Sequence, residues 1–208
     1  MPYKTISGLF DDYADAKSAV TNLEAAGIPR GDISIVANNT DMRYTMGGEA
    51  GHSKAAAGAG TGATLGGLVG GGAGLLAGLG MLAIPGVGPV VAAGWLVAAA
   101  AGVAAGAAIG GATGGIIGAM VREGVPPEHA HVFAEGVRRG ATLISVRVDD
   151  SRVEAAEGIL AEHNAVDADS RGAIYRESGW KGFDESAAPI SEEEIDAERD
   201  RLRNRPPV

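Results

Sequence analysis

Residues 141–148 read Ala-Thr-Leu-Ile-Ser-Val-Arg-Val, and Asp149 and Asp150 follow this stretch directly. A short run rich in β-branched and aliphatic side chains predicts a β-strand. The two carboxylates favour a helix after the strand, because they accept hydrogen bonds from the first free amides of a helix. Asn164 fits the left-handed conformation at the end of that helix. The apolar side chains between these points recur at helical spacing and are Val153, Ala156 and Leu160.

The N-terminal part of the chain repeats this pattern. Residues 3–10 predict a strand, Asp11-Asp12 follows it, and Gly27 is suited to a left-handed helix end. Residues 33–36 predict a second strand, and residues 38–54 are expected to form a polar loop. The apolar positions of the first helix are Ala16, Ala19, Val20 and Leu23, and Val153 lies 137 residues after Ala16.

Two matched halves predict an α+β fold of the ferredoxin-like type, with the element order β-α-β-β-α-β. A last strand is predicted over 171–176, and an extra helix between Pro126 and Gly140 precedes the strand 141–148. The alternative is that the likeness of the halves says nothing about topology, because any two strand–helix–strand units look alike in sequence. We divide the chain into four segments. Residues 1–54 hold the first half and its loop, 55–121 a helical hairpin, 122–178 the extra helix and the second half, and 179–208 a polar tail. The tail is expected to contain a short solvated helix that starts at a capping box, Ser191 to Glu194.

The central segment 55–121 contains no Asp, Glu, Lys, Arg or His, and it holds 21 of the 34 glycines. A glycine inside a helix costs about 1 kcal/mol relative to alanine. Repeated helical glycines are therefore expected where two helix backbones approach closely. Glycine recurs here every four residues in two ladders, and we predict that the ladders mediate helix packing and self-association. The ladder glycines are Gly58, Gly62, Gly66, Gly70, Gly74, Gly78, Gly102, Gly106, Gly110, Gly114 and Gly118.

These ladders predict a glycine-zipper helical hairpin over 55–84 and 89–121. Proline disfavours helix at the residue before it and is suited to the first turn of a new helix. Thirty helical residues measure about 45 Å, which exceeds the roughly 30 Å of bilayer hydrocarbon. The predicted hairpin turn consists of Pro85, Gly86, Gly88 and Pro89.

The hairpin is predicted to insert into a bacterial inner membrane. Lys54 and Arg122 flank its base, and basic flanks favour the cytoplasmic side, so both polar parts are expected in the cytoplasm. The alternative is a cytoplasmic assembly in which the ladders pack protein against protein, because glycine and alanine are only weakly apolar. In both cases the partner is a second copy of the chain, and the lipid bilayer is a partner in the first.

Composition excludes several classes of function. The formal net charge of −9 argues against a nucleic-acid partner, which requires a basic surface. The chain has no cysteine, which excludes disulfides and cysteine-ligated metals. The loose G-x-G-x-x-A matches follow no predicted strand, so no nucleotide site is predicted. His131 and Glu135 lie four residues apart, yet no third metal ligand accompanies them, and both are expected to be solvated. We predict no catalytic residues, no cofactor and no metal, while a small-molecule ligand stays unknown.

Several stretches resemble the bacterial general stress protein family, which comprises heat-induced and low-temperature-induced stress proteins, often classed as domains of unknown function. The first runs from Gly8 to Ala16 and continues through Gly27-Ile28 to the Asp-Ile-Ser-Ile-Val of 32–36. The second runs from Gly124 to Ala130 and continues from Arg139 to Asp149. The resemblance covers about 10–176, and a hairpin with glycine ladders between the halves is typical of the membrane-associated members.

This resemblance implies a stress-induced protein with no assigned chemistry. We therefore predict a non-enzymatic, membrane-associated stress protein that oligomerises through its glycine-zipper hairpin and has a structural or envelope-stabilising role. The alternative is a soluble ligand-binding or regulatory module whose hairpin drives self-assembly.

Overall fold

The computed structural model describes residues 3–40, 80–99 and 115–204. Within these ranges the chain forms one five-stranded sheet in the order β1-β5-β2-β4-β3, and all neighbouring strands are antiparallel. The fold is α+β, as predicted. The strands are β1 (Tyr3–Phe10), β2 (Ile33–Asn38), β3 (Gly80–Ile84), β4 (Gly88–Ala93) and β5 (Thr142–Asp149).

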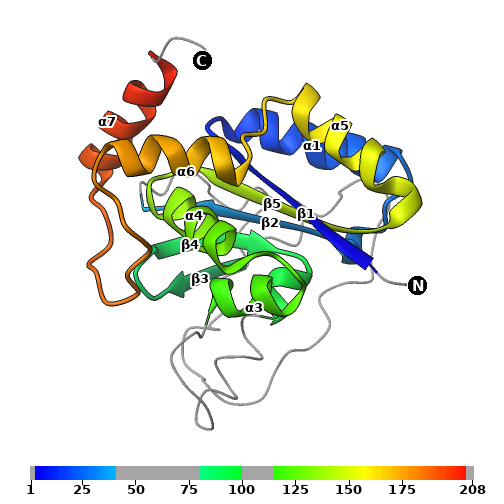
Figure 1. Ribbon diagram of the computed structural model, residues 1–208, viewed down its shortest axis with the longest axis horizontal. Coiled ribbons are helices and arrows are strands. Elements are labelled where there is room, and N and C mark those ends of the chain that lie inside the picture. Colours follow the sequence, from blue (N-terminus) through cyan, green and yellow to red (C-terminus); the bar gives the residue numbers. More distant parts are fainter. Residues whose placement is uncertain (1–2, 41–79, 100–114, 205–208) are drawn as a thin grey trace, which may run out of the picture.

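One face of the sheet is covered by α1 (Tyr13–Ala25) and α5 (Val153–Glu162), which lie side by side (Figure 1). Alternate residues of the central strands face these helices, because side chains along a strand point to opposite faces. The helix ends follow the sequence. Asp12 accepts a hydrogen bond from the amide of Ala14, and Gly27 and Asn164 have φ angles of 82° and 64°. The apolar helix positions predicted from sequence are buried here and include Ala16, Ala19, Leu23, Ala156 and Leu160.

The opposite face carries α3 (Ile116–Arg122), α4 (Pro127–Arg138) and α6 (Ala168–Glu177), together with the helical residues 95–99. The predicted extra helix is thereby confirmed as α4. Two short 3-10 helices, η1 (Arg30–Asp32) and η4 (Asp150–Arg152), precede β2 and α5. The second core cluster lies beneath these helices and includes Leu9, Val36, Leu96, Met120, Phe133 and Leu143.

The prediction of two helices over 55–84 and 89–121 is wrong for residues 80–84 and 89–93, whereas residues 95–99 and 116–121 are helical as predicted. Residues 80–84 and 88–93 are β3 and β4, and their turn joins two strands rather than two helices. A strand at 88–93 can pair with β2, which is buried along its whole length, and this pairing outweighs the weak helix propensity of a Gly-Pro-Val-Val run. Gly94 has a φ of 96° and ends β4 against the backbone of Ile33. Across the described ranges, no helix has the length and apolar character that crossing a bilayer requires.

The predicted strand at 171–176 is also wrong, because these residues belong to α6. Asp167 caps this helix by accepting a hydrogen bond from the amide of Ser170, and Arg171 and Tyr175 lie one turn apart on its buried face. On the edge of β1 that does not face β5, the described chain forms a single β-bridge, between Leu9 and Val166. The ferredoxin-like arrangement split by a helical hairpin is therefore not confirmed.

The C-terminal helix α7 (Glu192–Arg203) begins with the predicted capping box, in which Ser191 and Glu194 exchange hydrogen bonds. Its predicted exposure to solvent on all sides is wrong. Ile195 is only 1% exposed, and Glu198 and Arg199 turn toward the body of the protein. Figure 1 shows the chain leaving α6, passing the β3–β4 turn and returning to α7 beside α6.

Candidate functional site

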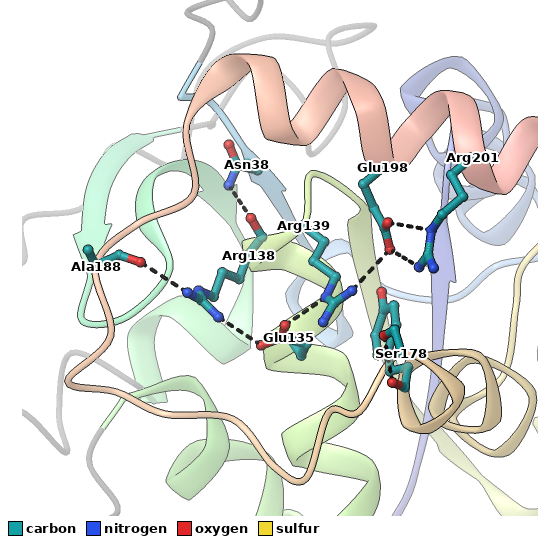
Figure 2. Close-up of polar contacts among 9 residues, drawn as sticks. Asn38, Glu135, Arg138, Arg139, Ser178, Ala188, Glu198 and Arg201 are labelled. Carbon is teal, nitrogen blue, oxygen red and sulfur yellow. Dashed lines mark hydrogen bonds and ion pairs between the residues drawn. The ribbon is translucent and has the colours of Figure 1, made fainter.

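The most concentrated polar cluster of the described residues surrounds Glu135, near the end of α4. Its carboxylate is 1% exposed and accepts a hydrogen bond of 2.7 Å from Nε of Arg139. Nη1 of Arg138 lies 3.5 Å from its other oxygen (Figure 2). A buried carboxylate requires such partners, because burial without them costs several kcal/mol. The cations come from positions three and four residues further along the same helix, which share its face.

The cluster extends to α7 through Glu198. Nη1 of Arg139 lies 3.2 Å from the Glu198 carboxylate, and Arg201 donates two hydrogen bonds of 2.8 Å to it. Burial opposes ionisation of Glu198, but the charges and hydrogen bonds of Arg201 and Arg139 outweigh it and hold its pKa below the ordinary value. Because the carboxylates are engaged by guanidinium groups, the cluster is suited to joining helices rather than to transferring protons.

An apolar contact lies next to this cluster. Ile195 packs over Gly140, which follows α4 and has a φ of 96°. Arg199 donates a hydrogen bond of 3.1 Å to the carbonyl of Gly140. Full burial of an isoleucine side chain contributes about 1.5–3 kcal/mol. Ile195 is thus the principal apolar anchor of α7, whose other eleven residues include nine charged ones.

The chain between α6 and α7 packs against the β3–β4 turn. We call residues 180–203 the C-terminal strap. A Cβ on Gly86 would lie 2.7 Å from the carbonyl oxygen of Asp184, and one on Gly88 would lie 3.0 Å from Pro189. Phe183 is buried in the second core cluster. The strap therefore passes so close to the turn that only glycine fits at these two positions.

Arg138 connects the polar cluster around Glu135 with the C-terminal strap. Its Nη2 donates a hydrogen bond of 3.1 Å to the carbonyl of Ala188 in the strap, while its Nη1 approaches Glu135. Asn38, the last residue of β2, donates a hydrogen bond of 3.3 Å to the carbonyl of Arg138 (Figure 2). It also lies 3.1 Å from the carbonyl of Val137. The end of α4 is thus the point where β2 and the strap meet.

A second buried pair joins α6 to the start of α1. Arg171 is 1% exposed, and its Nη2 lies 2.7 Å from the Asp11 carboxylate. Burial would lower the pKa of Arg171, but the hydrogen bond to Asp11 and the nearby charges raise it above the ordinary value. Tyr175 lies one turn further along, and the Arg139 guanidinium is 4.4 Å from the centre of its ring. Burial raises the pKa of Tyr175 far above the ordinary value, so its hydroxyl is protonated at neutral pH.

A hollow of about 140 Å³ opens between β1 and the first turns of α4 and α6. Its polar groups are already engaged. Asp167 caps α6, Asp169 lies 3.3 Å from Nε2 of His129, and Thr5 donates a hydrogen bond of 2.8 Å to the carbonyl of Glu123. Acidic side chains at a helix start also complement its dipole. The carboxylates of the hollow are thus accounted for by the helices that carry them.

The residues singled out from sequence lie in different places. Gly118 lies in α3, where it is partly exposed, and the other ladder glycines fall outside the described residues. Pro85 and Gly86 lie in the β3–β4 turn, and Gly88 and Pro89 are the first two residues of β4. His131 and Glu135 do not share a site, and Glu135 is buried rather than solvated. The signal that sequence reasoning missed is an acid on the apolar face of α4, followed three and four residues later by arginine.

Comparison with known families supports the resemblance seen in the sequence. Residues 5–84 match the family described as the heat-induced stress protein YflT domain. This stretch contains β1, α1, β2 and β3, so the resemblance to a bacterial stress-protein family is confirmed for this part of the chain. The strap lies outside the matched residues. Neither the curated proteins nor the solved structures gave a match.

Proposed function

We propose that the chain is a non-enzymatic stress-response protein that works by self-association through its uncharged glycine-rich segments. The family match supplies the association with stress. The folded body then acts as a rigid support for segments 41–79 and 100–114, which contain all the ladder glycines except Gly118. The predicted transmembrane hairpin with a turn at 85–89 is not part of this proposal.

One observation carries the proposal. Gly80 pairs with Ala92 across the β3–β4 hairpin, and this pair lies at the open end, away from the turn. Gly80 follows the last glycine of the first ladder by two residues, and Ala92 precedes the first glycine of the second ladder by ten. The hairpin thus fixes where one ladder ends and where the approach to the other begins. Such fixed points reduce the entropy lost when the two segments act together.

The strand order supports the same idea. Segment 41–79 leaves the body after Thr40, beside the turn end of the hairpin, and re-enters at Gly80, at the open end. Its ends are therefore separated by the length of a strand.

The test is chemical crosslinking of the full chain with leucine placed in each ladder. We expect Gly66→Leu and Gly110→Leu to reduce the oligomeric fraction at least tenfold, because a side chain would separate closely packed backbones. Gly158→Leu is the matched control, since Gly158 is exposed on α5 with open space around it. If both ladder variants crosslink as the control does, the proposal is wrong.

A bilayer is the other surface that the uncharged residues 55–79 and 100–114 can contact. Flotation of the chain with vesicles of anionic and zwitterionic lipid separates the two cases. We expect the oligomer to form without lipid. Oligomers that form only on vesicles would transfer the proposal to a membrane surface.

A further inference from the structure

The C-terminal strap contacts the body of the protein at two separate places. It reaches α4 through Ile195 and Glu198, and it reaches the β3–β4 turn through the stretch 183–189. It therefore connects two elements that are far apart in sequence. We infer that the strap is a latch that regulates self-association by holding the β3–β4 hairpin in place. This inference rests on the proposed function.

The docking of α7 combines one buried apolar side chain with ion pairs. Glu198 and Arg139 are 12% and 18% exposed, so salt screens their attraction only in part. Ile195 is the single fully buried apolar side chain of the helix. Contacts of this kind give a unit that opens before the rest of the protein, because local stability follows the number of buried apolar contacts.

The two ends of α7 carry residues that favour its helical state when it is docked. Its first turn carries Glu192, Glu193 and Glu194, and its last turn carries Arg201 and Arg203, which complements the helix dipole. The Ser191–Glu194 capping box closes its start. An isolated helix of about 12 residues is only marginally stable in water, so α7 loses part of its hydrogen bonding when the strap opens, and these end residues favour its return when the strap closes.

Opening has a direct consequence for the hairpin. The backbone at 184–185 and Pro189 cover Gly86 and Gly88, and β3 is the last strand of the described sheet. When the strap leaves, β4 keeps its pairing with β2 and β3 keeps its pairing with β4, but the hairpin loses the contacts at its turn. Thr40, which lies beside this turn and precedes the first glycine-rich segment, then becomes less fixed, so the open latch weakens self-association.

Hydrogen exchange of the full chain tests the opening step. We expect Ile195→Ala to speed exchange of the α7 and 183–188 amides together by at least tenfold, and in both the parent chain and the variant these amides should open at a lower free energy than those of β5. Glu193→Ala is the control, because Glu193 is exposed on the same helix. A second variant, Glu198→Gln, removes only the charge facing Arg139 and should give a smaller increase. Unchanged exchange in both variants would overturn the latch.

Crosslinking of the same variants tests the coupling. We expect Ile195→Ala to lower the oligomeric fraction at least threefold. If α7 opens but the oligomer is unchanged, while Gly66→Leu still dissociates it, the latch inference fails and the proposed function stands. If Gly66→Leu and Gly110→Leu both leave the oligomer intact, the proposed function fails, and the latch as its regulator fails with it.

Discussion

Ile195 packs over Gly140, and a methyl group on Gly140 would overlap the Ile195 side chain. Gly140 follows α4 and has a left-handed φ of 96°, which favours glycine. The absence of a side chain also leaves the space that Ile195 occupies. This contact is what connects a highly charged C-terminal helix to the body of the sheet. It explains why α7 is buried on one side although its sequence is predominantly charged.

A first prediction follows from that overlap. Gly140→Ala and Gly179→Ala both place alanine at a left-handed position, with φ of 96° and 86°, but nothing lies near Gly179. The backbone strain is therefore similar, about 1–2 kcal/mol. We expect Gly140→Ala to lower the free energy of unfolding by about 1–3 kcal/mol more, the usual cost of overpacking. Equal effects in chemical denaturation would contradict the packing of α7 on Gly140.

A second prediction concerns the anchor itself. Ile195→Ala removes a side chain that is 1% exposed, and we expect a loss of about 2–4 kcal/mol in the free energy of unfolding. Val121→Ala truncates a side chain that is 38% exposed and should cost under about 1 kcal/mol. Urea denaturation of both variants gives the comparison. If the two variants lose the same free energy, Ile195 is not the anchor of α7.

The third prediction concerns the Asp11–Arg171 pair. Asp11→Ala leaves the buried guanidinium unpaired, and we expect a cost of about 2–3 kcal/mol, at the low end for buried pairs because Asp11 is 41% exposed. Adding Arg171→Met removes the unpaired charge and should restore part of this stability. A double variant that is less stable than Asp11→Ala alone would show that the pair is not the main role of Arg171.

The fourth prediction is a pH dependence. The pKa of Glu198 is lowered in the folded chain, so its contribution to stability is complete above its ordinary value of 4.5. That contribution is lost as the pH falls from 4.5 through the lower folded pKa. We expect the difference in thermal midpoint between the parent chain and Glu198→Gln to be largest at neutral pH and to shrink at acid pH. A difference that is constant with pH would remove Glu198 from the account.

Much of the fold was predictable because local signals and packing agree there. Asp12 caps α1, Gly27 ends it, and Pro127 starts α4, each by a backbone preference that its own residue type sets. The strand at 142–149 contains enough β-branched side chains for its sequence alone to predict a strand. Where one residue type satisfies one local requirement, sequence is sufficient.

The errors arose where distant pairing decided the outcome. Residues 88–93 become a strand because β2 is beside them, and that neighbour is not visible in a glycine and alanine pattern. Residues 171–176 look extended, but the cap at Asp167 and the buried pair of Arg171 with Asp11 favour a helix. The docking of α7 depends on a glycine more than fifty residues away, which no window along the chain can relate to Ile195.

The central claim is self-association of the chain, and sedimentation velocity of the full protein over a wide concentration range tests it most directly. The account predicts species larger than the 20.8 kDa chain that increase with concentration in the absence of lipid. The increase should be lost in Gly66→Leu and retained in Gly158→Leu. A single species of 20.8 kDa at every concentration, with and without vesicles, would contradict the account.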